Sequence, residues 1–151
     1  MPKEESYVKA LFGVFQAMHK ALIQTVGKSD LAVMRKAGNN GSGIFFPNLP
    51  SNLSLVEASK KLEEGVSSLE VFGELKVAKV EGLTVKVEFC DCLISRILKD
   101  AGFECGTQAP CYFGFGLVDE TLKRLTGKKC TMSFDSHDTG KKLCFESVKV
   151  E

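Results

Sequence analysis

The stretch ELKVAKVEGLTVKVEFC, residues 74–90, decides the fold. Apolar and polar side chains alternate through most of both halves, and Glu81-Gly82 separates the halves. A period of two places the apolar side chains of a strand on one face. The stretch therefore predicts a β-hairpin with one buried face.

The same alternation returns near the C-terminus, in residues 130–134 and again in Leu143-Phe145, on either side of the polar turn 135–140. Apolar residues at helical spacing predict helices over residues 6–26, 31–37 and 55–71, a further helix that Asp91 could cap and that carries Leu93, Ile94, Ile97 and Leu98, and a last helix over residues 111–125. Gly102 is expected to close the fourth helix and Gly127 the fifth. The order α-α-α-β-β-α-α-β-β predicts an α+β protein, with an antiparallel sheet of about four strands and helices packed on it.

Two local signals refine this outline. Asn39-Asn40-Gly41-Ser42-Gly43 is rich in turn residues and predicts a break after Gly38, continued by irregular structure through Phe45-Phe46 to Pro50. Ser54 and Glu57 have the spacing of a capping box, which predicts a helix that begins at Leu55.

Length and charge limit the possible functions. The chain has 151 residues, 20 basic against 19 acidic, and a net charge of +1. Binding to nucleic acid through phosphate contacts is therefore disfavoured. The N-terminal residues do not read as a signal peptide, and no apolar run approaches the roughly 18 residues that span a bilayer. We expect one domain over residues 1–151, located in the cytoplasm with reduced thiols.

All six cysteines lie in the last part of the chain, from Cys90 onward. If the strand continues past Cys90, Cys92 presents its sulfur on the same face. Zinc prefers about four thiolate or imidazole ligands, and Cys111, His137 and Cys144 could complete such a site. The alternative is that these cysteines are small buried apolar residues.

Catalytic patterns do not emerge from the sequence. The two histidines, His19 and His137, have no serine in a nucleophile motif beside them. Asp119-Glu120 is expected on a solvated helix face. We expect a binding protein, and an enzyme acting on a vinyl or tetrapyrrole substrate is the least favoured hypothesis.

The C-terminal half carries a set of motifs in a particular order. A strand ends in Cys90, Cys111-Tyr-Phe-Gly-Phe-Gly opens a helix, Leu-Thr-Gly-Lys-Lys follows, and Gly140-Lys-Lys-Leu-Cys-Phe lies in the last strand. This pattern resembles the 4-vinyl reductase domain family, including the archaeal hydrocarbon-binding protein group, and Met34-Arg-Lys-Ala-Gly38 is similar to a helical segment of that family. The family is similar in fold to a subunit of the vesicle-tethering complex TRAPP.

The resemblance implies an apolar cavity, a role as small-molecule sensor or carrier, frequent dimerisation through helices, and a cysteine-bound metal. It makes Cys90 or Cys92, Cys111 and Cys144 the candidate ligands. The chain departs from the family pattern at Ser133 and Ser136, where the family has Glu and Cys. His137, one residue further on, is a candidate substitute.

Two hypotheses follow. The first is an apolar small molecule bound between sheet and helices, with the ligand-binding residues Phe12, Phe15, His19, Phe45 and Phe46 and a possible zinc ion at Cys90, Cys92, Cys111, His137 and Cys144. The second is a homodimeric interaction module without a small ligand. Val14 and Ile23 lie beside the main apolar stripe of the first helix and would suit a helix covered on two sides.

Overall fold

The computed structural model describes residues 4–70, 72–98, 105, 106 and 108–151. In chain order its elements are α1 (Glu4–Val26), a 3-10 turn (Gly27–Ser29), α2 (Asp30–Phe45), α3 (Leu55–Ser68), β1 (Glu74–Glu81), β2 (Thr84–Cys90), α4 (Leu93–Leu98), α5 (Ala109–Thr126), β3 (Cys130–Asp138) and β4 (Leu143–Val150). The predicted order of helices and strands is confirmed. Gly102, expected to close α4, lies outside the described residues.

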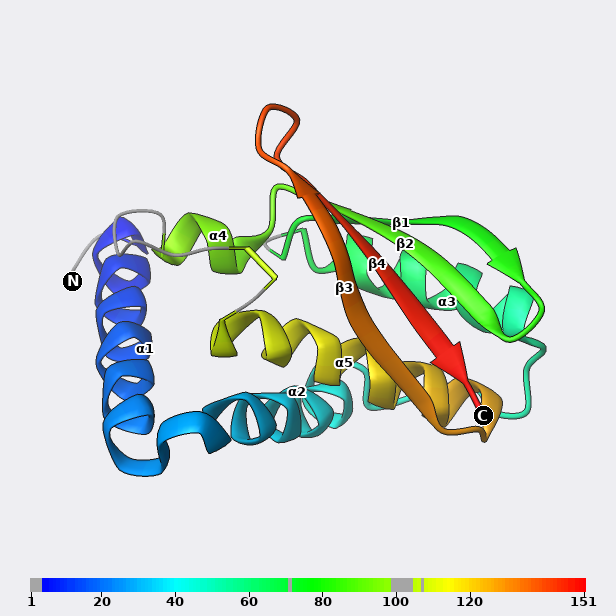
Figure 1. Cartoon of the computed structure of the whole chain (residues 1–151), viewed down its shortest axis with the longest axis horizontal. Helices are drawn as coiled ribbons and strands as arrows, with labels where there is room; N and C mark the ends of the chain where they lie inside the picture. The colour runs from blue at the N-terminus through cyan, green and yellow to red at the C-terminus, as the bar shows by residue number, and fades with distance from the viewer. Residues whose placement is uncertain (1–3, 71, 99–104, 107) are drawn as a thin grey trace.

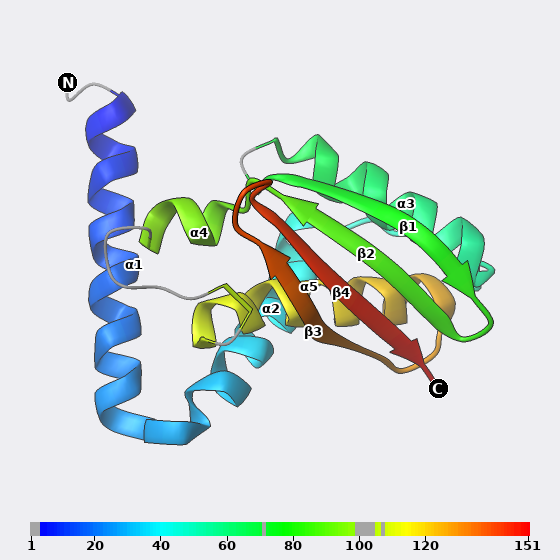
Figure 2. The ribbon, with the colours of Figure 1, turned by 45° about the horizontal axis from the view of Figure 1, so that its top comes forward.

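The four strands form one antiparallel sheet in the order β1-β2-β4-β3. Helices α3 and α5 lie against one face of this sheet, and α2 packs along α5 (Figures 1 and 2). The core fills the space between sheet and helices, with Leu62 from α3, Leu122 from α5 and Val148 from β4 fully buried. The predicted α+β class is therefore confirmed.

The Leu143-Phe145 pair suggested that these two side chains of β4 face the core, but the structure buries the other face of the strand. Leu143 and Phe145 are half-exposed, whereas Cys144 and Glu146 are buried. The phase of β4 follows Val148, which pairs with Val85 of β2 and packs in the core. Because the strand is oriented to bury Val148, Cys144 and Glu146 face the interior in place of Leu143 and Phe145.

The expected break after Gly38 is wrong, because α2 continues without interruption through the glycine-rich segment to Phe45. The glycines serve a helix contact. A Cβ on Gly38 would lie 2.0 Å from the Phe113 carbonyl oxygen of α5, and one on Gly116 would lie 1.9 Å from the Arg35 carbonyl oxygen of α2. The two backbones touch at this crossing, and only glycine permits that approach.

A buried polar group fixes the same crossing. Asp119 of α5 is 9% exposed, so its expected place on a solvated face is wrong. Arg35 Nε donates to Asp119 Oδ2 at 2.7 Å, and the backbone N–H of Met132 donates to Asp119 Oδ1 at 2.6 Å. Arg35 also donates to the Met132 carbonyl oxygen. One carboxylate thereby connects α2, α5 and β3.

The start of α3 and the end of α5 lie where the sequence predicted them. The Ser54 Oγ accepts from the Glu57 N–H at 3.3 Å, and Glu57 Oε2 accepts from the Ser54 N–H at 3.0 Å, so the predicted capping box is confirmed. Helix α5 ends at Gly127, which has a left-handed φ of 76°.

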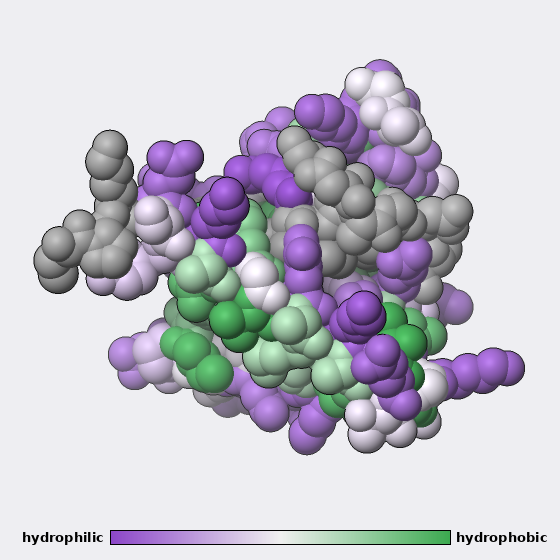
Figure 3. Space-filling view, turned by 90° about the vertical axis from the view of Figure 1, so that its left-hand side faces the viewer, coloured by the Kyte–Doolittle hydropathy of each residue, from purple (hydrophilic) through white to green (hydrophobic). Residues whose placement is uncertain are grey.

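Helix α1 stands apart from the sheet and the other long helices (Figures 1 and 2). All of its residues are described, and none of them is buried. Leu11 and Met18 are 66% and 67% exposed, and apolar side chains gather on the face of the molecule that α1 presents in Figure 3. Among the described helices, none is long and apolar enough to cross a membrane.

Candidate ligand cavity and cysteine–histidine cluster

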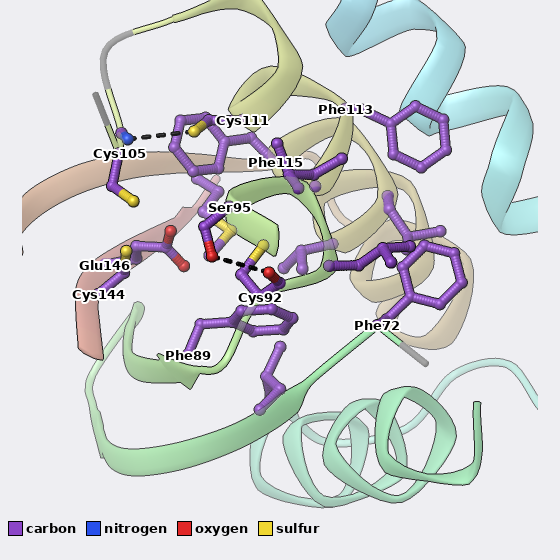
Figure 4. Close-up of a pocket in the computed structure, with 18 of the residues that line it drawn as sticks. Phe72, Phe89, Cys92, Ser95, Cys105, Cys111, Phe113, Phe115, Cys144 and Glu146 are labelled. Carbon is purple, nitrogen blue, oxygen red and sulfur yellow. Dashed lines mark hydrogen bonds between the residues drawn. The ribbon is translucent and has the colours of Figure 1, made fainter. Parts of the chain in front are cut away.

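A small cavity lies between the inner face of the sheet, helix α4 and the first turns of α5 (Figure 4). The sheet contributes Leu75, Phe89, Met132, Cys144 and Glu146, and α5 contributes an apolar set that includes Phe113, Phe115 and Val118. About 60 Å³ is open to the centre of a water-sized sphere. This is well below the roughly 150 Å³ of an engineered cavity that holds benzene, so a single-ring ligand fits only if the cavity widens when it binds.

The lining is apolar apart from a few groups, and Glu146 is the sole carboxyl among the described residues that line it. Glu146 is 7% exposed. Burial, together with the charge of Asp135, raises the pKa of its carboxyl from 4.5 to about 8. No described residue donates a hydrogen bond to this carboxyl.

Four cysteines also border the cavity: Cys92, Cys105, Cys111 and Cys144. Burial raises the pKa of Cys92 to about 11 and that of Cys111 to about 12, and it raises the pKa of Cys105 and of Cys144 as well. These thiols are therefore protonated at neutral pH without a metal, and a protonated thiol is a poor nucleophile.

Two of these sulfurs join a histidine in a compact cluster. Ligand atoms of Cys105, His137 and Cys144 all lie within 4.8 Å of one another, and His137 Nδ1 is 3.1 Å from Cys144 Sγ. Of the residues predicted as metal ligands, the structure brings His137 and Cys144 together. Cys90, Cys92 and Cys111 lie outside this cluster, and Cys105, which was not in the predicted set, belongs to it.

A β-bulge explains how His137 reaches Cys144. The pairing of β3 with β4 shifts between Phe134 and Ser136, so that His137 pairs with Cys144. In an unbroken antiparallel register, Ser136 would occupy that position. The bulge adds one residue to β3 and thereby turns His137 toward the inner face.

Polar contacts on the outer face hold the extra residue, Asp135. The Ser147 hydroxyl donates to Asp135 Oδ2, Lys86 Nζ donates to the Ser147 Oγ at 2.6 Å, and Lys86 Nζ lies 3.4 Å from Asp135 Oδ2. These contacts keep Asp135 out of the interior.

Cys90 and Cys92 do not present their sulfurs on the same side. Asp91 between them has a left-handed φ of 52°, which turns the chain at the end of β2. Cys92 consequently lines the cavity, whereas Cys90 borders a separate surface hollow with Asp91 and Arg96. Cys111 lines the cavity beside the cluster, where its sulfur accepts a hydrogen bond from the Gly106 N–H at 3.1 Å.

The residues expected to contact a ligand lie elsewhere. Phe12, Phe15 and His19 are half-buried on α1, and Phe46 is buried in the core. Phe45 lies behind the cavity wall: its ring packs edge-on against Phe72, which lines the cavity, with centroids 5.0 Å apart. None of these five lines the cavity.

The cavity uses other aromatic residues, namely Phe72, Phe89, Phe113 and Phe115. Phe89 and Phe115 occupy positions that look like ordinary core positions of a strand and a helix. The Cys111-Tyr-Phe-Gly-Phe-Gly segment was the part of the sequence that could have indicated the cavity. It supplies Cys111, Phe113, Gly114 and Phe115 to the lining.

The donor chemistry of the cysteine–histidine cluster fits a metal ion that prefers thiolate and imidazole ligands. Two thiols and an imidazole are ligands that zinc prefers, and in a tetrahedral site they would lie roughly 3–4 Å apart. The observed grouping within 4.8 Å needs little adjustment to reach that spacing. Three protein ligands leave one coordination position open.

Solved structures share this fold. The phenol-responsive sensory domain of the transcription activator PoxR, determined with phenol, has a TM-score of 0.65 and 12% identity over 92% of this chain and 74% of that one. Subunit 3 of the trafficking protein particle complex from Naegleria fowleri, covalently bound to palmitic acid, has a TM-score of 0.63 and 10% identity over 98% of this chain and 97% of that one.

A vinyl-4-reductase family protein from Methanocaldococcus jannaschii also superposes on the chain. Its TM-score is 0.54, with 14% identity over 100% of this chain and 83% of that one. No protein-family model matches the chain, and no curated protein matches it in sequence. The predicted resemblance in fold, both to the vinyl-4-reductase family and to the TRAPP subunit, is therefore confirmed at the level of three-dimensional structure.

Proposed function

We propose that residues 1–151 form a small-molecule binding domain that senses an apolar ligand in the cavity between α4, α5 and the sheet. The observation that carries this proposal is an apolar interior space with a single buried carboxyl group at its wall. Binding sites for small molecules are typically concave and apolar, with few polar groups that fix orientation. The PoxR domain was determined with phenol and the trafficking subunit with palmitic acid, which supports an apolar ligand for this fold.

A zinc ion at Cys105, His137 and Cys144 is part of the proposal. These residues would hold the ion between the segment that carries Cys105 and the β3–β4 hairpin. When bound, the ion would supply a structural cross-link beside the cavity, and it would keep the two thiols deprotonated.

A homodimer through α1 is a second proposed property. A 23-residue helix with no buried residue gains little from packing, and isolated helices are marginal in water. Its exposed apolar residues include Leu11, Val14, Met18 and Ile23. A second copy of α1 would cover them.

Filling the cavity tests the proposed binding site. Gly114 lines the cavity, and a Cβ built on it meets nothing within 4 Å. Gly114→Leu should therefore occupy ligand space without a backbone clash. Gly43→Leu on α2 is the matched control, because Gly43 is exposed and its Cβ also meets nothing within 4 Å.

Binding of phenol and of toluene would be measured by isothermal titration calorimetry and ligand-observed NMR. We expect at least one of these probes to bind the wild type and Gly43→Leu, and Gly114→Leu to lose at least tenfold in affinity. Equal binding by all three proteins would place the ligand elsewhere. No binding of either probe by the wild type at any accessible concentration would contradict the proposed binding site.

A further inference from the structure

Glu146 occupies a position that costs stability unless something pairs with it. It is 7% exposed, and no described residue hydrogen-bonds to its carboxyl. Buried polar side chains nearly always have a partner, and an unpaired one carries a desolvation penalty. Its neighbours along the inner face of β4 are Cys144 and Val148, which are ordinary residues for a buried strand.

Among the residues that the structure describes, those around the carboxyl offer it no strong hydrogen-bond partner. Across the sheet, Glu146 pairs with Val87 of β2 and Phe134 of β3, whose side chains are apolar. Lys86 lies on the opposite face of the sheet, where it is paired with Ser147 and Asp135. With these described neighbours set aside, the space that the Glu146 side chain faces is where a hydrogen-bonding partner can lie.

That space is the cavity. Glu146 lines it, and Figure 4 shows the side chain directed from β4 toward the interior, in the same region as Cys92, Cys105 and Phe89. The rest of the described lining is apolar, apart from groups that offer a ligand weaker hydrogen bonds than a carboxyl does. Thiols are weak hydrogen-bond donors and acceptors, and the Ser95 hydroxyl already donates to the Cys92 carbonyl oxygen at 2.8 Å.

We propose that Glu146 is the polar anchor of the cavity, and that the ligand is a small, largely apolar molecule whose one hydroxyl or amine group hydrogen-bonds to the Glu146 carboxyl. This inference rests on the proposed function and narrows its ligand class from apolar molecules in general to those with one polar hydrogen-bonding group. A pure hydrocarbon of the same shape would leave the carboxyl unpaired.

A pair of probes with the same shape tests the anchor. Phenol and toluene are single-ring probes that differ by one hydroxyl in place of one methyl, so the cavity must widen to the same extent for both. We expect wild-type protein to bind phenol roughly tenfold to a hundredfold more tightly than toluene, which is the discrimination that one buried hydrogen bond supports. Glu146→Met should bring the two affinities within about threefold, whereas Glu146→Gln should retain part of the preference.

Glu88→Met is the matched control, since Glu88 lies on the neighbouring strand β2, pairs with Phe145 and does not line the cavity. It should keep the wild-type preference. Thermal unfolding would confirm that Glu146→Met folds, and we expect it to be at least as stable as the wild type because it loses a buried carboxyl to which no described residue donates a hydrogen bond.

The outcomes separate this inference from the proposed function. Equal affinities of the wild type for both probes would overturn the anchor while leaving the binding cavity intact. Loss of bound zinc in Glu146→Met, with an unchanged phenol preference, would overturn it by assigning the carboxyl to the metal. Failure of the wild type to bind either probe would remove the ligand site itself, and the anchor with it.

Discussion

At the scale of single residues, Glu146 connects folding stability to pH. Its pKa of about 8 in the folded protein lies above the ordinary 4.5, so the folded state binds the proton more tightly than the unfolded state. The resulting stabilisation is fully present below about pH 4.5 and is lost as the pH rises toward 8. The linked change is on the order of a few kcal/mol.

For the metal-free protein we therefore expect the free energy of unfolding of the wild type to fall, relative to Glu146→Gln, between about pH 4.5 and pH 8. Urea titrations at several pH values would measure this difference. Parallel pH profiles for the two proteins would show that Glu146 is not buried in a low-dielectric site.

Several of these residue roles could not be inferred from the sequence. Asp119 stands beside Glu120 on a helix, and nothing in that pair indicates that Asp119 receives Arg35 from a helix 84 positions away. Glu146 lies in a strand whose nearest apolar pair, Leu143-Phe145, suggested the opposite phase. In both cases a contact with a residue far along the chain determines which side chain is buried. The pattern of neighbouring residues in the sequence does not indicate that contact.

At the scale of elements, the crossing of α2 and α5 depends on glycine. Gly38→Ala would place a methyl group 2.0 Å from a backbone oxygen, and the two helices must then separate. We expect a loss of about 2–4 kcal/mol in the free energy of unfolding, as for other overpacked or disrupted cores. Chemical denaturation would measure it.

Gly43→Ala is the control for that change. Gly43 belongs to the same helix, but its Cβ meets nothing within 4 Å, so alanine should stabilise the protein by about 0.5–1 kcal/mol. Similar effects of both substitutions would contradict the close contact of the two helices.

The β-bulge in β3 gives a prediction for the proposed zinc site. Exchanging the two residues, as Ser136→His with His137→Ser, should move the imidazole to the outer face and weaken zinc binding by at least tenfold. Cys144→Ser and Cys105→Ser should weaken it similarly, whereas Cys90→Ser should not, because Cys90 borders a different hollow. Competition with a chromophoric chelator would measure the affinities.

Equal zinc affinity of the exchanged protein and the wild type would show that the bulge does not determine which of residues 136 and 137 can bind zinc. Loss of zinc in Cys90→Ser would instead favour the ligand set that was predicted from the sequence.

The element-scale predictions from sequence succeeded where local chemistry decides the outcome. The hairpin of residues 74–90 and the capping box at Ser54 depend on near neighbours, and both are confirmed. The glycine-rich part of α2 was mistaken for a turn, because its glycines are explained by α5 rather than by their own neighbours. The bulge at Asp135 could not be predicted from the sequence either, because the outer-face contacts that hold it come from β2 and β4.

At the scale of the whole molecule, α1 is the part that packs least. We expect the protein to form a dimer through this helix, and Leu11→Glu with Met18→Glu to convert it to a monomer. Val56→Glu on α3 is the control, since Val56 is 66% exposed, like Leu11, but lies on another helix. Light scattering coupled to size-exclusion chromatography would measure the masses.

A monomeric wild type at all accessible concentrations would contradict the dimer. Dissociation caused equally by Val56→Glu would place the interface elsewhere on the molecule.

A small ligand in the interior cavity should travel with the protein through purification. Native mass spectrometry of the untreated, freshly purified protein would detect it, with Gly114→Leu and Gly43→Leu prepared in the same way. We expect an additional bound mass of single-ring size on the wild type and on Gly43→Leu, and its absence from Gly114→Leu. A wild-type spectrum with bare protein alone, unchanged after addition of phenol or toluene, would contradict this expectation.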